Sequence, residues 1–140
     1  MHDLRFRDDA AQHQPVATLA AFLDHSNATA VRLEPGDDAR LLIPHLGQLA
    51  LVEIAFPTFR DGRGYSAARI LREAGYSGEL RARGDVLVDQ IAFMRRCGFD
   101  SFGPDQPLDP AAVDTALSRF SEVYQPAADG AVPIWKLRHG

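Results

Sequence analysis

The chain has 140 residues, about the length of one ordinary domain, and 46% of them are hydrophobic. No run approaches the 18 or more apolar residues of a membrane helix, so no membrane span is expected. The net charge of −4 argues against a nucleic-acid-binding protein that neutralises phosphates. The polar start lacks the pattern of a secretory signal, and the single cysteine, Cys97, excludes an internal disulfide. We therefore expect a cytoplasmic protein.

The apolar pattern predicts a single domain with a shorter segment at each end. Residues 1–15 show little apolar patterning, which indicates a flexible lead-in. Residues 16–124 carry the regular elements of the domain. Residues 125–140 are rich in alanine, proline and glycine, but the apolar stretch 132–137 predicts a tail that docks on the body or on a neighbouring subunit.

Four segments have the character of strands, and a helical pattern follows each. The clearest is Leu49 to Phe56, an apolar run that only Glu53 interrupts, as in a strand covered on both faces. The repetition predicts an α/β domain with about four parallel strands. Two arrangements are open, a three-layer open sheet with helices on both faces or half of a β/α barrel with helices on one. The predicted strands are residues 30–33, 49–56, 79–83 and 100–103.

Helix boundaries are predicted from capping residues, because short polar side chains favour helix starts and glycine favours helix ends. Pro44 is expected to shorten or kink the first of these helices, which ends near Leu46. Gln90 lies toward the apolar side of its helix, which favours a hydrogen bond between helices. The predicted starts are Asp37 or Asp38, Ser66, Asp85 and Asp109, and Gly75 and Gly98 are predicted ends.

The carboxyl ends of parallel strands gather polar residues at one edge of the predicted sheet. The turn that follows Phe56 offers arginines, a helix start and backbone amides, which together favour a small anion. The competing interpretation is structural, with Asp61 paired to an arginine and with Ser66 and Asp85 serving as helix caps. Strand alternation sends Arg83 to the same face as Arg81. The candidate ligand-binding residues are Arg60, Asp61, Arg63, Tyr65, Ser66, Arg83 and Asp85.

The residue pattern gives little support for a dinucleotide site, a metal site or a reactive thiol. Gly62 and Gly64 lack the third glycine of a dinucleotide fingerprint, so no cofactor is assigned. The histidines show no metal-ligand spacing, and one cysteine cannot hold a cluster, so no metal is predicted. Cys97 stands at a predicted helix C-terminus, where the dipole disfavours thiolate, and we expect it to be a buried packing residue. No residue is assigned a catalytic role.

Two long motifs carry a family resemblance, FPTFRDGRGYSAARILRE at residues 56–73 and GELRARGDVLVDQIAFMRRCGFDSF at residues 78–102. They resemble a bacterial family of unknown function whose members are labelled probable oxidoreductases involved in sulfite reduction. The resemblance implies an association with the sulfite reductase pathway and implies no particular reaction.

Three hypotheses follow for the function. The leading one is an accessory protein of assimilatory sulfite reduction that binds sulfite reductase or a small anion at the strand-end edge, with positive charge from Arg60, Arg63 and Arg83. The second is an enzyme acting on an oxyanion or a phosphorylated small molecule at the same edge. The third is a non-catalytic domain that forms a homodimer.

Overall fold

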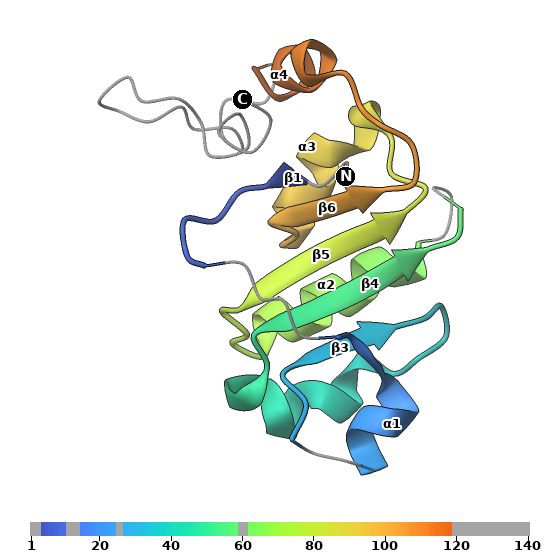
Figure 1. Cartoon of the computed structure of the whole chain (residues 1–140), viewed down its shortest axis with the longest axis vertical. Helices are drawn as coiled ribbons and strands as arrows, with labels where there is room; N and C mark the ends of the chain where they lie inside the picture. The colour runs from blue at the N-terminus through green and yellow to red at the C-terminus, as the bar shows by residue number, and fades with distance from the viewer. Residues whose placement is uncertain (1–3, 11–14, 25–26, 59–61, 119–140) are drawn as a thin grey trace.

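The computed structural model describes residues 4–10, 15–24, 27–58 and 62–118, which form a mixed sheet accompanied by helices (Figure 1). The described strands make one open sheet in the order β1-β6-β5-β4-β3-β2. Neighbouring strands are parallel except β1, which runs antiparallel to β6. The strands are β1 (Leu4–Arg5), β2 (Ala17–Thr18), β3 (Ala30–Leu33), β4 (Leu51–Phe56), β5 (Glu79–Gly84) and β6 (Ser101–Pro104).

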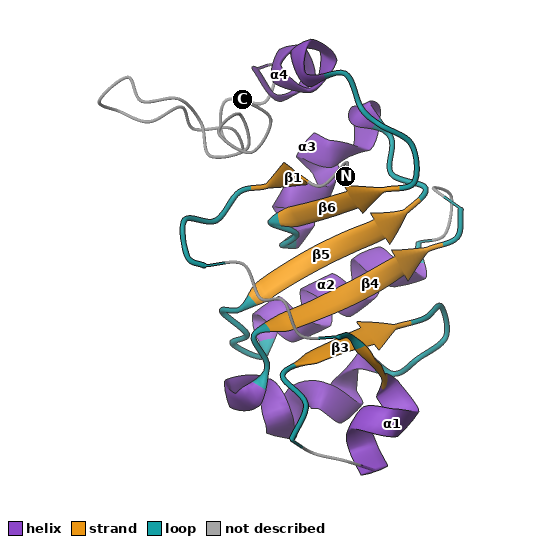
Figure 2. Ribbon diagram, viewed as in Figure 1, coloured by secondary structure: helices purple, strands orange, loops and turns teal. Residues whose placement is uncertain are grey.

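The helices lie mainly on one face of this sheet. Strands β3 to β6 are adjacent in sequence order, so each right-handed crossover steps in the same direction and leaves its helix on the same side. Figure 2 shows α2 behind β4 and β5, while the facing side of β4, β5 and β6 carries no described helix. Of the two predicted arrangements the helices take the one-sided form, and the sheet does not close. The helices are α1 (Leu19–Asp24), the 3-10 helix η1 (Ala39–Gln48), α2 (Arg63–Glu73), α3 (Val88–Cys97) and α4 (Pro110–Ser118).

The main core fills the layer between the sheet and these helices. Alternate residues of β4, among them Val52, Ile54 and Phe56, are buried toward the helices. The Phe56 ring determines how close α2 can come, because a Cβ on Gly64 would lie 2.4 Å from it. Glycine at the start of α2 therefore permits the close packing of α2 on β4.

The strand predictions are confirmed to within a residue or two, whereas two predicted helix caps are wrong. Helix α2 begins at Arg63, so Ser66 already lies in its first turn and donates its N–H to the Gly62 carbonyl. Helix α3 begins at Val88 and has Leu87 at its N-cap position. The N–H of Asp85 donates to the Phe56 carbonyl at 2.8 Å, which continues the contact between β5 and β4 and delays the helix.

The segment predicted as a helix from Asp37 or Asp38 is a 3-10 helix. Asp38 caps it, as expected, by accepting a hydrogen bond from the Arg40 N–H at 3.0 Å. Pro44 lies inside and supplies no backbone donor for an α-helical ladder. The tighter winding turns Leu41 outward, where it is 47% exposed, and leaves Leu42 buried.

Other boundary predictions hold. Gly75 and Gly98 have positive φ angles of 100° and 116° at the ends of α2 and α3. Asp109 precedes Pro110 and accepts a hydrogen bond from the Ala111 N–H at 3.2 Å. Within the described residues, no helix is both long and apolar enough to cross a membrane.

The segment predicted as a flexible lead-in contributes an edge strand. Leu4 pairs with Phe102 and Arg5 with Ser101, and Leu4 is buried in the core. A strand of two residues is too short to show an alternating pattern, so the sequence offers no signal for it. The tail at 125–140 lies outside the described residues.

Candidate functional site

The face of the sheet without described helices carries a row of polar side chains that crosses every strand. Each residue in the row stands opposite its neighbour in the strand register, so the row runs perpendicular to the strands. Parallel strands are usually covered on both faces by apolar layers, which makes a polar row across this sheet unusual. In spatial order the row is Thr18, Arg32, Glu53, Arg81, Ser101 and Arg5.

Glu53 on the central strand β4 holds three arginines from the two neighbouring strands. Its Oε1 accepts from Arg32 Nε at 2.8 Å and lies 2.7 Å from Arg32 Nη2. Its Oε2 accepts from Arg81 Nε at 2.7 Å and from Arg83 Nε at 2.6 Å. We call these four residues the arginine cluster.

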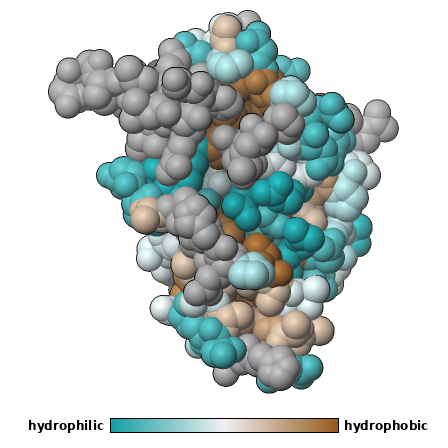
Figure 3. All heavy atoms as spheres, in the orientation of Figure 1, coloured by the Kyte–Doolittle hydropathy of each residue, from teal (hydrophilic) through white to brown (hydrophobic). Residues whose placement is uncertain are grey.

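The arginine cluster is buried at its centre and open at its rim. The Glu53 side chain is 1% exposed, whereas the side chains of Arg32 and Arg83 are 42% and 35% exposed. Arg32 and Arg81 alone place two positively charged guanidinium groups beside the single carboxylate of Glu53. Arg32 and Arg81 together therefore carry one positive charge more than Glu53 balances. Figure 3 shows hydrophilic residues gathered over the middle of this face.

The arginines keep Glu53 ionised despite its burial. Burial alone would raise the pKa of Glu53, but the hydrogen bonds from Arg83 and Arg32 and the charge of Arg81 outweigh that effect. The net result is a pKa below the ordinary value of a glutamate.

Small neighbours give Arg83 its position on the sheet. In the register Arg83 stands between Ala55 on β4 and Gly103 on β6. A Cβ on Gly103 would lie 2.7 Å from the guanidinium carbon of Arg83. The missing side chain therefore lets the guanidinium group lie directly over β6.

The residues predicted from sequence as one ligand site are separated in the structure. Arg63 and Ser66 of α2 line an open pocket of about 340 Å³ together with the loop that starts at Gly36. Of the predicted strand-end site, Arg63 and Ser66 therefore lie together in the structure. Arg60 and Asp61 lie outside the described residues.

Tyr65 points away from that pocket and into the interface between α2 and α3. Its ring lies between those of Phe56 and Phe93, with centroids 5.3 and 5.1 Å away. Its hydroxyl donates to Gln90 Oε1 at 2.7 Å, which confirms the hydrogen bond between helices predicted for Gln90. Burial raises the pKa of Tyr65, as expected of a packed tyrosine.

Arg83 and Asp85 follow one another on β5 but have different surroundings. Arg83 is directed onto the sheet face and Glu53, on the face that strand alternation predicts. Asp85 stands just beyond the strand, where its N–H continues the contact with β4. The predicted set thus contributes one residue, Arg83, to the arginine cluster.

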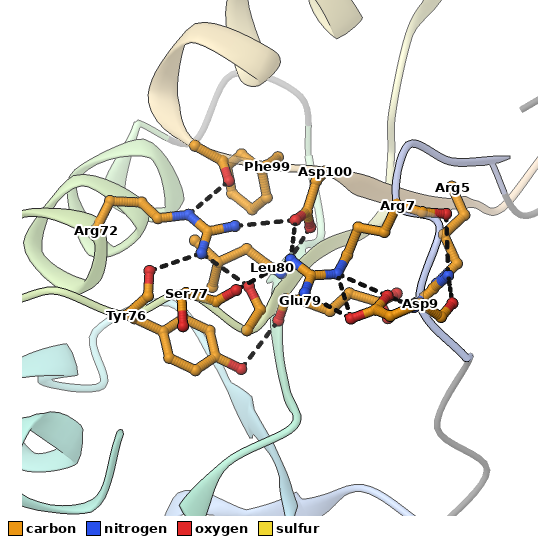
Figure 4. Close-up of polar contacts among 12 residues, drawn as sticks. Arg5, Arg7, Asp9, Arg72, Tyr76, Ser77, Glu79, Leu80, Phe99 and Asp100 are labelled. Atoms are coloured by element: carbon orange, nitrogen blue, oxygen red, sulfur yellow. Dashed lines mark hydrogen bonds and ion pairs between the residues drawn. The ribbon is translucent and has the colours of Figure 1, made fainter. Parts of the chain in front are cut away.

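A second set of buried ions lies near the amino end of β5 (Figure 4). Asp100 accepts from Arg7 Nη1 at 2.7 Å, from Arg72 Nη2 at 3.1 Å and from the Leu80 N–H at 2.9 Å. Beside it, Arg5 Nε donates to Glu79 Oε1 at 3.1 Å. We call these residues the edge cluster.

The edge cluster is bound largely to the backbone. Arg72 also donates to the carbonyls of Gly98, Tyr76 and Gly78, at 2.8 to 2.9 Å. Arg5 donates to the carbonyls of Arg7 and Asp9. These bonds connect the N-terminal segment and the end of α2 to the sheet, so the edge cluster has a structural role.

The described residues contain no candidate metal site, and their single cysteine is buried. Its histidine, cysteine and acidic residues form no group of three that could hold a metal ion. Cys97 is buried and forms no disulfide, in agreement with its predicted packing role.

The predicted ligand set missed three members of the arginine cluster, Arg32, Glu53 and Arg81, although Arg81 is predicted on the same face as Arg83. A signal was present, because Glu53 is the charge that interrupts an apolar strand, and Arg32 occupies the outward position of the strand before it. Placing Arg32 and Glu53 beside Arg81 requires the strand register, which the local sequence does not specify.

The fold and the arginine cluster define an open, one-sided α/β domain with a charged sheet face. Comparison with protein-family models matches residues 30–135 to the family described as "Bacterial protein of unknown function (DUF934)", and the chain belongs to this family. The comparisons with curated proteins and with solved structures each gave no match.

Proposed function

We propose that the protein binds a small oxyanion on the arginine cluster and serves as an accessory protein in sulfite reduction. The observation that carries the proposal is Glu53, a buried carboxylate that holds Arg81 and Arg32, of which Arg32 keeps a side chain 42% exposed. Arginine side chains that a carboxylate already holds in place lose less conformational entropy on binding, and guanidinium forks match anionic oxygens. The family resemblance in residues 56–102 supports the choice of sulfite or sulfate as the ligand.

The test measures thermal unfolding of the protein in sulfite, sulfate and chloride at equal ionic strength. A ligand that binds only the folded state raises the midpoint in a saturable way. We expect sulfite or sulfate to do so for the wild type and not for the double variant Arg32→Gln/Arg81→Gln. Arg40→Gln is the matched control, because Arg40 is 70% exposed and pairs with Asp38 at the start of η1, outside the arginine cluster.

The double variant also accounts for a general salt effect, since sulfate stabilises many proteins by exclusion from their surfaces and would stabilise this variant as well. Equal stabilisation of the wild type and of the double variant would contradict the proposal. The partner form of the proposal is tested by calorimetry with sulfite reductase. Heat of binding that the wild type and Arg40→Gln give and the double variant does not would place the partner on the same cluster.

A further inference from the structure

An open groove between α3 and α4 is independent of the arginine cluster. Its volume is about 440 Å³, within the range of about 300 to 1,000 Å³ that accepts small ligands or bulky groups. Val88 lines it from α3, and Ala111, Ala112 and Ala116 line it from α4. Ala111 is exposed and the other two alanines are half-buried, so the groove has an apolar floor that the described residues leave unfilled.

The rim of this groove is acidic. Asp89 in the first turn of α3 and Asp109 at the start of α4 both line it, and both are exposed. A small apolar floor with carboxylates beside it is complementary to a bulky apolar side chain that has cationic neighbours.

The chain itself contains such a segment, in residues 132–138, whose sequence is VPIWKLR. Trp135 is the single tryptophan of the protein, and Lys136 and Arg138 stand close to it. Acidic residues are absent from this segment. The family match extends to residue 135 and therefore includes Trp135.

The length of the chain permits this segment to reach the groove. The described part ends at Ser118, the last residue of α4, and α4 forms one wall of the groove. Residues 119–131 separate α4 from the segment. At roughly 3.3 Å per residue they can span about 43 Å, more than a return to the neighbouring groove requires. Linkage to α4 also gives the segment a high effective concentration at the groove.

We propose that residues 132–138 dock in the α3–α4 groove of their own chain, with Trp135 on the alanine floor and with Lys136 and Arg138 beside Asp89 and Asp109. Docking would bury about 150–250 Å² of an aromatic side chain and hold α4 on α3.

Fluorescence of the single tryptophan in the full-length protein tests this proposal directly. We expect a blue-shifted emission and a quenching constant with acrylamide several-fold lower than that of a peptide of residues 129–140. Ala112→Leu, which fills the groove, should restore peptide-like quenching. Ala21→Leu on the exposed face of α1 is the matched control and should leave quenching unchanged.

A charge-reversal experiment distinguishes loss of docking from a disturbance of α4 by Ala112→Leu. Asp89→Lys should raise the quenching, and Asp89→Lys/Lys136→Asp should lower it again. Peptide-like quenching in the wild type would overturn the proposal, as would protection that neither groove variant changes. Protection that disappears on dilution, together with dimers in sedimentation, would instead place the segment on a second copy and overturn docking within one chain.

Discussion

Glu53 and Asp100 are both nearly buried carboxylates that receive bonds from two or more arginines, but their arginines are used differently. Around Asp100, Arg72 donates its remaining hydrogen bonds to backbone carbonyls of the α2–β5 connection and to that of Gly98 at the end of α3. Around Glu53, Arg32 has a side chain 42% exposed. The comparison indicates that an arginine bound to backbone carbonyls connects parts of the fold, whereas one held by a side chain on an open face can receive a ligand.

Asp100→Ala should have the largest effect on stability. The substitution leaves Arg7, Arg72 and the Leu80 N–H without their common partner in a site where the carboxylate is only 12% exposed. Removing one side of a buried ion network costs about 3–5 kcal/mol. Urea unfolding measures the loss, and a change below about 1 kcal/mol would show that the edge cluster does not hold the fold together.

Glu53→Gln should separate stability from ligand binding. The variant loses the charge that holds three guanidinium groups together, so we expect the free energy of unfolding to fall by about 3 kcal/mol. Anion binding should become tighter, because the internal competitor for the arginines is gone. Urea unfolding with and without sulfate measures both effects. Weaker sulfate protection in Glu53→Gln than in the wild type would contradict this interpretation of the arginine cluster.

Arg72→Met and Arg32→Met form a matched pair across the two clusters. Arg72→Met removes bonds to Asp100 and to three backbone carbonyls, and should cost about 2 kcal/mol. Arg32→Met removes a bond at a half-exposed site and should cost less than about 1 kcal/mol. The same unfolding assay compares them. Equal losses would remove the distinction between the clusters.

The smallest expected effect is the change of the unfolding free energy with pH that is due to Glu53. The pKa of Glu53 lies below its ordinary value in the folded state, so its ion pairs stabilise the protein above about the unfolded pKa, 4.5. That contribution is lost as the pH falls through the folded pKa. Unfolding free energies measured from pH 7 to pH 3 should therefore show the gap between the wild type and Glu53→Gln narrowing at the acid end. A constant gap would mean that the charge of Glu53 contributes little.

Local signals were sufficient for strands β3 to β6 and for the ends of helices α2 and α3, but not for the two-residue strands β1 and β2. The apolar run that ends at Phe56 predicted a buried strand, and the glycines at 75 and 98 predicted helix ends with positive φ. Helix starts were less predictable. Ser66 and Asp85 have the side chains of caps, but packing of α2 on Phe56 and the hydrogen bond from Asp85 to Phe56 determine where the chain enters each helix.

The candidate site, like the fold, was predictable from the sequence only in part. Alternation along β5 was enough to place Arg81 and Arg83 on one face, because side chains of a strand point alternately to its two sides. The sequence by itself thus determined an α/β chain, its main strands and the face of these two arginines. Only the tertiary structure brought Arg32 and Glu53 beside them, because residues from separate strands become neighbours through the pairing register. The tertiary structure also decided that the helices cover one face of the sheet, because strands β3 to β6 lie side by side in sequence order. The arginine cluster therefore lies on the other face.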